Sequence, residues 1–285
     1  MPELNNIVPT RIHSSEELIN PKDEQAFIAW LGKKYGFQYS LYSNYYKYAS
    51  KALKDNLESS EYWKHFEDFL REINLEYQKE FSCELLETTQ LPEIYIKELK
   101  SVVNKAFRKD FLKNDLRPEE PKDGWIGPDN WFEKLNDILR TTIVVNYLDG
   151  VSFLITKLKD YANKYGYEFK HDYEARDNGY YAAHTGTKIS LTMPRNGDLE
   201  DVNVSISLEI QITTPLQKLV KDLLHTYYEE DRCSSNPDEP TLWQWEYKSD
   251  RFNTNYMGHI VHYVEGMIVR LRDKRNNNIN NVQQL

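Results

Sequence analysis

Residues 202–213 read VNVSISLEIQIT, and this stretch decides the fold. Aliphatic side chains occupy its even positions and polar side chains occupy its odd positions. Because successive side chains of a strand point to opposite faces of a sheet, this alternation predicts a strand with one buried face. Thr214 and Pro215 follow in the order of an N-cap and a first helical residue, and the apolar spacing of residues 216–228 predicts a helix.

The segments on either side also carry periodic patterns. Upstream, helical spacing marks residues 16–83, and Ser59 or Ser60 could cap a helix whose apolar positions run from Tyr62 through Phe66 and Leu70 to Leu75. Pro92 opens a further helix, whereas residues 117–130 are rich in proline and glycine and predict a loop. The remaining patterns predict, in order, strands at 141–146, 167–172 and 188–193 with a helix at 151–165 after the first of them, and a last helix at 253–272. We therefore expect an α+β fold in which helices cover one mixed sheet, with a loose N-terminal arm and a frayed C-terminal tail.

The composition is that of a folded chain with few cysteines. It has 285 residues, of which 40% are hydrophobic and 28% charged, and a net charge of −9. An acidic chain is a poor candidate for non-specific binding to nucleic acid, because the phosphate backbone attracts positive charge, although a local basic groove is still possible. Cys83 and Cys233 are too few for a zinc finger or an iron–sulfur site, so we expect reduced thiols. Neither a long apolar run nor a secretory signal is present, and we therefore expect a cytoplasmic protein with no membrane partner.

Two carboxylates stand beside predicted strands. Asp137 lies shortly before the strand at 141–146, and Glu209 projects from the polar face of the strand at 202–213. Carboxylates on neighbouring strands can converge on Mg²⁺, which prefers one or two carboxylates plus substrate phosphates. Each residue also has a structural alternative, because Asp137 could cap a helix or turn and Glu209 could lie on the solvated side of an edge sheet.

Two further clusters carry groups that suit a nucleotide. Residues 176–184 (RDNGYYAAH) bring together a cation, a tight turn, two aromatic rings and a histidine. An aromatic plane can stack on a base, although packing alone also accounts for paired tyrosines. The basic stretch 97–109 is a positive island in an acidic chain, which suits polyphosphate binding or is a solvated helix face.

Together these segments resemble the synthetase domain of the RelA/SpoT alarmone family over residues 90–230. The family's acidic-Ile-Gln-Ile-Arg-Thr pattern corresponds to residues 209–214 (EIQITT), and its Gly-Tyr loop with a histidine corresponds to residues 179–184 (GYYAAH). Its aspartate before a β-branched strand corresponds to Asp137, and four motifs in the right order make the resemblance specific.

Two helical matches complete the resemblance. The family's basic helix with a Lys-Ser pair corresponds to Lys100 and Ser101, followed by Lys105 and Arg108. A histidine in the helix after the catalytic strand corresponds to His225.

Members of this family transfer the β,γ-diphosphate of ATP to a ribose 3′-hydroxyl, usually that of GDP or GTP, which gives (p)ppGpp. The resemblance implies a nucleotidyltransferase-like α+β fold with a mixed sheet of about five strands covered by helices. It divides the chain into a helical N-terminal extension at 1–90, a synthetase core at 91–231 and a C-terminal helical extension with a tail at 232–285.

The resemblance also implies a role for each motif residue. Asp137 and Glu209 would be catalytic and would hold Mg²⁺, and Glu209 could alternatively act as the general base on the acceptor hydroxyl. The ATP-binding residues would be Lys100, Lys105, Arg108 and Arg140. The acceptor-binding residues would be Arg176, Tyr180, His184 and Gln211.

The chain departs from the family pattern at two arginine positions. Thr142 stands where an arginine normally flanks the adenine, and Arg140 is the candidate to replace it because both residues point to the same side of a strand. Thr213 stands where the pattern has its arginine, which removes a cation expected near the phosphates of the acceptor. The acceptor therefore stays open between GDP or GTP and the 3′ end of tRNA, the target of some toxic small synthetases.

The resemblance also bears on partners. The hydrolase and regulatory parts of long family members are missing from this sequence, so we expect a synthetase-only enzyme. An unopposed synthetase needs an antitoxin protein, encoded nearby or built into the helical extensions, and a homo-oligomer stays open. A third hypothesis is a catalytically degenerate module that senses a nucleotide or binds a partner.

Overall fold

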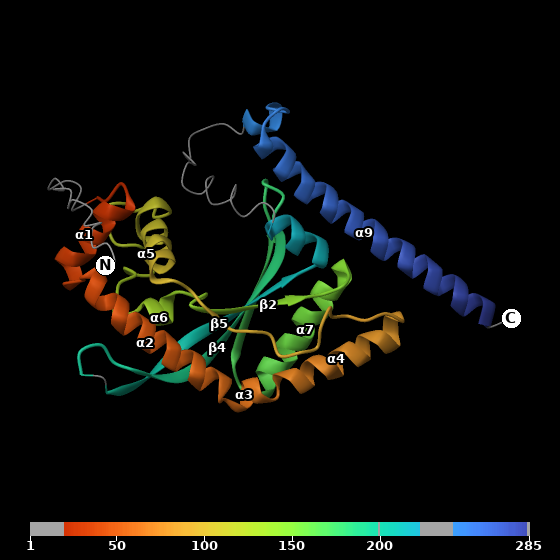
Figure 1. The fold of residues 1–285 in the computed structure, drawn as a ribbon, viewed down its shortest axis with the longest axis horizontal. Helices are drawn as coiled ribbons and strands as arrows, with labels where there is room; N and C mark the ends of the chain where they lie inside the picture. Colours follow the sequence, from red (N-terminus) through yellow and green to blue (C-terminus); the bar gives the residue numbers. More distant parts are fainter. Residues whose placement is uncertain (1–19, 199, 223–241, 284–285) are drawn as a thin grey trace, which may run out of the picture.

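The computed structural model describes residues 20–198, 200–222 and 242–283. Within them, five strands form one sheet in the order β1-β2-β5-β4-β3 (Figure 1). The strands are β1 (Tyr95–Ile96), β2 (Leu139–Val144), β3 (Glu168–Ala175), β4 (Tyr181–Pro194) and β5 (Asp201–Thr213). β2 runs parallel to β5 and the other neighbours are antiparallel, so the expected mixed five-stranded sheet is confirmed.

Helices precede, connect and follow the strands. They are α1 (Glu24–Tyr35), α2 (Tyr39–Glu58), α3 (Glu61–Lys64), α4 (Phe66–Phe81), α5 (Leu99–Phe107), the π-helical turn η1 (Arg108–Leu112), α6 (Trp131–Lys134), α7 (Leu148–Lys164), the 3₁₀ turn η2 (Leu242–Trp245) and α9 (Asp250–Gln283). Residues 215–222 are also helical and are called helix 215–222 below. The expected N-terminal arm, His225 and Cys233 lie outside the described residues.

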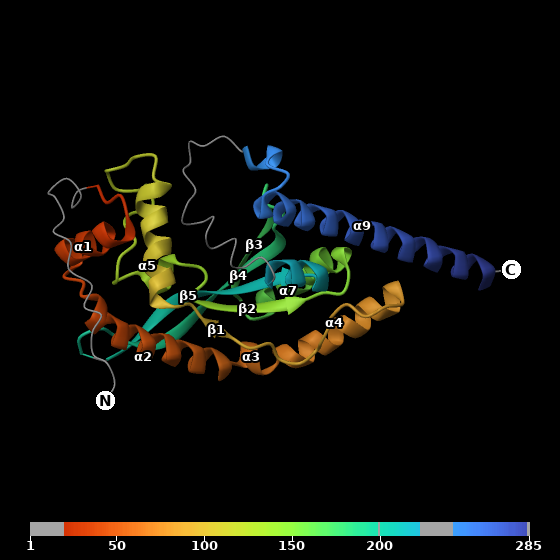
Figure 2. The same cartoon turned by 45° about the horizontal axis from the view of Figure 1, so that its top comes forward.

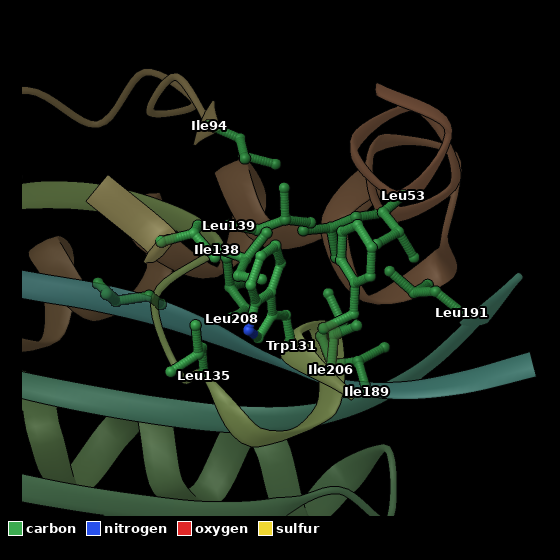
Figure 3. Close-up of a cluster of buried hydrophobic side chains, with 14 of the residues drawn as sticks. Leu53, Ile94, Trp131, Leu135, Ile138, Leu139, Ile189, Leu191, Ile206 and Leu208 are labelled. Atoms are coloured by element: carbon green, nitrogen blue, oxygen red, sulfur yellow. The ribbon is translucent and has the colours of Figure 1, made fainter. Parts of the chain in front are cut away.

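The central strand β5 follows the pattern that its sequence predicts. Its aliphatic side chains from Val204 to Ile212 are buried, whereas Glu209 and Gln211 on the opposite face are only half-buried. The aliphatic face packs against α2 and α6, and Figure 3 shows Ile206 and Leu208 of β5 grouped with Leu53 of α2 and Trp131 of α6. Apolar burial on one face therefore leaves the polar face of the sheet for other uses.

The helices before residue 90 share this hydrophobic core with the sheet. Ser60 caps α3 as predicted, since its Oγ accepts the backbone N–H of Trp63 at 3.3 Å. Phe66 and Leu70 of α4 are buried, but Leu75, which the same periodicity placed with them, is exposed. The N-terminal helices thus support the sheet directly rather than forming a core of their own.

Three elements differ most from the bounds that the sequence predicts. The helix expected to open at Pro92 begins at Leu99, because residues 95–96 pair with β2 and the backbone N–H of Lys97 donates to Ile138 O at 2.9 Å. β4 begins at Tyr181 rather than near residue 188, since its first half pairs with both β3 and β5. α9 continues to Gln283, beyond Arg272, so the expected frayed tail is wrong through that residue.

Helix α9 begins beside the strand ends and leads away from the sheet (Figures 1 and 2). Arg272 anchors it to α7, because the Arg272 guanidinium donates to both carboxylate oxygens of Asp149 at 2.8 and 3.2 Å. Among the helices that the structure describes, none combines the length and the apolar content that a membrane crossing requires.

Candidate active site

The polar face of the sheet brings three of the sequence motifs into register. Arg140 of β2 is the partner of Glu209 of β5, and Glu209 is in turn the partner of Gly186 of β4. One step along, Gln211 has His184 of β4 on its other side. Directly opposite residues of paired strands lie within side-chain reach, so these motifs, far apart in sequence, share one surface.

Glu209 is joined on this face to a neutral side chain, which is joined in turn to a positive one. The Gln211 amide Nε2 donates to Glu209 Oε1 at 2.7 Å, and Lys221 Nζ of helix 215–222 donates to Gln211 Oε1 at 3.2 Å. Gln211 was expected to bind the acceptor and Lys221 was not singled out. The signal for Lys221 is a lysine in the second turn of the helix that follows β5.

Tyr180 and His184 form a second pair beside Glu209. The Tyr180 hydroxyl lies 3.0 Å from His184 Nε2, and the Arg176 guanidinium stands over the Tyr180 ring at 5.2 Å. Arg176 Nε also donates to Glu174 at 2.8 Å, so its direction is fixed. Burial lowers the pKa of His184 and so favours a neutral imidazole, whereas the charge of Glu209 acts in the opposite direction.

The turn that carries Tyr180 is held by α9. Gly179 has φ +77° and Gly258 of α9 lies against it, so closely that a Cβ at either glycine would collide with the backbone of the other segment. His259 Nδ1 pairs with the Tyr181 hydroxyl at 2.8 Å, and the His262 ring stacks on the Tyr181 ring at 3.8 Å. The predicted turn at 177–179 is confirmed, and α9 fixes its position.

Asp137 lies in a turn before β2 and is held by two lysines. Lys97 Nζ lies 2.9 Å from one carboxylate oxygen and Lys105 Nζ lies 2.8 Å from the other. Burial raises the pKa of Asp137, but the charges of Lys105 and Lys97 outweigh it, so the pKa lies below its usual value. The sequence placed Lys105 in this site and gave Lys97 no role of its own.

The basic helix places its predicted ATP-binding residues on different sides. Lys105 faces Asp137, and Arg108, three residues on and half-buried, begins the π-helical turn η1. Lys100 is exposed, and five residues of α-helix rotate it by about 140° from Lys105. Arg140 is exposed on β2, in register with Glu209.

Asp137 and Glu209 have different partners, the lysines Lys97 and Lys105 for Asp137 and the amide of Gln211 for Glu209. Over residues 20–198, 200–222 and 242–283, no group of three acidic, histidine or cysteine side chains is arranged to hold a metal ion. Their oxygens are nevertheless the donors that Mg²⁺ prefers, and Mg²⁺ usually takes one or two carboxylates and completes its shell with water and substrate phosphates. The donor set therefore fits Mg²⁺ when a polyphosphate is present.

Comparison with known proteins gives structural similarity alone. No protein-family model and no curated protein matches this chain. The chain is similar to the solved structure of a GTP pyrophosphokinase family protein from Streptococcus pneumoniae, with a TM-score of 0.49 and 16% identity over 84% of this chain and 95% of that one. The structural neighbours named here are alarmone synthetases or GTP pyrophosphokinases.

Two further neighbours come from Bacillus subtilis. Small alarmone synthetase 1, bound to its product pppGpp, has a TM-score of 0.46 and 14% identity over 75% of this chain and 93% of that one. Small alarmone synthetase 2 has a TM-score of 0.42 and 18% identity over 75% of this chain and 96% of that one.

Proposed function

We propose that this chain is an ATP-dependent pyrophosphokinase that transfers the β,γ-diphosphate of ATP to the ribose 3′-hydroxyl of GDP or GTP. The observation that carries the proposal is the register of Arg140, Glu209 and Gly186, next to that of Gln211 and His184. It sets the motif residues that resemble the alarmone synthetases on one face of three adjacent strands.

The reaction needs positioning and charge neutralisation rather than a covalent nucleophile. The acceptor 3′-oxygen would attack the β-phosphorus of ATP, and the bond from that phosphorus to the oxygen bridging to the α-phosphate would break, so that AMP leaves. Glu209 would take the hydroxyl proton, since its carboxylate is only half-buried and carries one hydrogen bond from Gln211. Tyr180 would stack on the acceptor base, with Arg176 and His184 beside its phosphates.

The ATP side would be built around Asp137. Lys97 and Lys105 are already at this carboxylate, and a polyphosphate brings the negative charge that two ammonium groups attract. Asp137 and Glu209 would hold Mg²⁺, which supplies charge neutralisation on the phosphates when bound. Arg140 would lie along the adenine, while Arg108 and Lys100 are further candidates for ATP.

Labelled ATP tests the proposal directly. Purified protein with [γ-³²P]ATP and GDP or GTP should give AMP and a labelled guanine nucleotide with two added phosphates. Glu209→Gln should lower turnover by about 10²–10⁴-fold while nucleotide binding persists. No labelled product with any acceptor, with nucleotide binding intact, would instead favour the catalytically degenerate module.

One observation favours a second candidate, the 3′ end of tRNA as acceptor. Thr213, where the family pattern has its arginine, is buried, so this position presents no cation to a 5′-polyphosphate. A terminal adenosine in RNA has only a phosphodiester there. Label transferred to bulk tRNA and not to GDP or GTP would identify this toxic type of synthetase. The antitoxin, a homo-oligomer and a cytoplasmic location stay predictions.

A further inference from the structure

Two positions at which this sequence departs from the family pattern line the same cavity. Thr142 of β2 and Thr213 of β5 both border a space of about 300 Å³ between the edge of β2, residues 87–95 and helix 215–222. The resemblance puts an arginine at each of these positions. The cavity therefore has hydroxyl groups where two cations would be expected.

Two lysines reach the same cavity from helix 215–222. Lys218 and Lys221 lie one helical turn apart and both line it. Lys221 is the one connected to the candidate active site, since its Nζ donates to Gln211 Oε1 at 3.2 Å and Gln211 donates to Glu209 at 2.7 Å. The positive charge of Lys221 also acts on His184, so Lys221 lies close to two of the four candidate acceptor-binding residues, Gln211 and His184.

We infer that Lys221 binds the phosphate attached to the 5′-oxygen of the acceptor nucleotide and replaces, from the helix that follows β5, the cation missing at position 213. The inference rests on the proposed function and names the phosphate contact of that same site. An ammonium group on a four-carbon chain can make charge-assisted hydrogen bonds to a phosphate. Its link to Gln211 holds it beside the carboxylate that would take the acceptor proton.

The charges around the cavity favour one phosphate over several. Besides the two lysines, the cavity is lined by Glu87, Glu93 and Asp222. A triphosphate spread across the cavity would meet more like charge than a single phosphate beside Lys221. The same contact serves the 5′-phosphate of a free nucleotide and the phosphodiester of an RNA 3′ end.

An acceptor series without turnover tests the inference. Binding of guanosine, GMP, GDP and GTP is measured by calorimetry in the absence of ATP, with wild-type protein and the variants Lys221→Met and Lys221→Arg. In the wild type, affinity should rise most from guanosine to GMP and little after that. Lys221→Met should weaken GMP and GDP binding about tenfold to a hundredfold, as loss of a hydrogen bond between charged groups does, and leave guanosine binding within twofold.

Two matched controls separate a phosphate contact from a loss of charge or fold. Lys47→Met removes an exposed lysine of α2 and should leave the series unchanged, and Lys218→Met removes the second lysine of the cavity and should cost less than Lys221→Met. Lys221→Arg should retain most GMP binding. Thr213→Arg placed in the Lys221→Met protein should restore part of the loss, with the melting temperature of each variant checked.

The outcomes distinguish this inference from the proposed function. Equal losses for guanosine and GMP, or none, in Lys221→Met would overturn the role of Lys221, even if the enzyme makes alarmone. If Lys221→Met loses the gain in affinity from guanosine to GMP but the wild type shows no turnover, Lys221 remains a phosphate-binding residue and pyrophosphokinase activity is rejected. A parallel arm with a CCA oligonucleotide against free adenosine separates the RNA source from the nucleotide source. The acceptor is the one that the wild type binds more tightly, and this tighter binding should be lost in Lys221→Met.

Discussion

Two buried aspartates, Asp137 before β2 and Asp110 in η1, have opposite electrostatics. Asp137 has an ammonium group at each of its oxygens, and its pKa lies below the usual value despite burial. Asp110 is held mainly by a backbone group, since both of its oxygens accept the N–H of Ile126 at 3.2 and 3.1 Å, and burial raises its pKa to about 7. Burial is similar at the two sites, so the partners decide the charge.

The lysines near Asp110 show that a nearby positive charge alone does not lower the pKa of a buried carboxyl below its usual value. Lys109, Lys113 and Lys134 line a cavity of about 380 Å³ next to this carboxyl. Lys134 Nζ, however, donates to the backbone oxygens of Asp123 at 2.6 Å and Trp125 at 3.0 Å. A carboxylate that is ionised beside two lysines can bind a metal ion while those lysines pair with a polyphosphate. Asp110 instead holds the backbone N–H of Ile126, and this contact stabilises the loop before α6.

The largest effect should come from Asp137→Asn. It should lower turnover by at least about a hundredfold, as loss of an electrostatic contact to the transferred group does. It should also lower the free energy of unfolding by about 3 kcal/mol, because Lys97 and Lys105 stay partly buried beside each other without their counter-ion. Initial rates and urea denaturation measure both quantities.

Asp110→Asn is the matched control, since it makes the same chemical change at an equally buried site. Its turnover should stay within twofold of the wild type. If both variants lose activity to the same extent, the distinction between the two aspartates is wrong.

The next effect is a pH dependence of stability that belongs to Asp110. Its folded pKa of about 7 exceeds the unfolded value of about 3.9, so the stability that it contributes is fully present below pH 4 and is lost as the pH rises through 7. Between pH 5 and 8 this loss should be about 3 kcal/mol, and Asp110→Asn should remove it. Urea titrations of both proteins at several pH values measure the difference.

Asp137 should show the opposite sign in another pH window. Its pKa is lowered in the folded state, so its contribution is present above the unfolded value and is lost as the pH falls through the folded one. The difference in free energy of unfolding between the wild type and Asp137→Asn should therefore become smaller only below pH 4. If this difference disappears between pH 6 and 8 instead, the ion-paired state of Asp137 is contradicted.

The smallest effect concerns the two lysines of α5. Lys105→Met should raise the KM for ATP about tenfold, as expected for a lost hydrogen bond to a charged group, because Lys105 stands at Asp137. Lys100→Met should change it less than twofold, because Lys100 is exposed on another side of the helix. Equal effects would show that both grip ATP, as the resemblance implies.

Local signals predicted much of the fold. The alternation of residues 202–213, the cap at Ser60 and the turn at 177–179 each depend on neighbours in sequence, and all three are confirmed. The predicted starts at Pro92 and Lys188 were wrong, because the observed starts at Leu99 and Tyr181 depend on pairing with strands far along the chain. Side-chain periodicity carries no information about such pairing.

The candidate site also contains residues that local sequence signals predict and residues whose contacts depend on the tertiary fold. Motif spacing placed Asp137, Lys105, Glu209 and Gln211 in the machinery, and their roles stay predictions. It gave no role to Lys97, which reaches Asp137 only because residues 95–96 add a strand to the edge of β2. It also passed over Lys221, whose contact with Gln211 depends on how helix 215–222 turns back over the sheet.

The contact between Gly179 and Gly258 has a mechanical consequence. The two backbones touch without intervening side chains, so a side chain at either glycine would push the turn before Tyr180 away from the start of α9. Farther along, where α9 leads away from the sheet (Figure 1), Arg272 is bound to Asp149 of α7 and Asn276 donates to the backbone oxygen of Phe81 of α4. α9 therefore connects the turn before Tyr180 to α7 and to the end of α4, so a change at either of these outer contacts would alter the support of the Tyr180 ring.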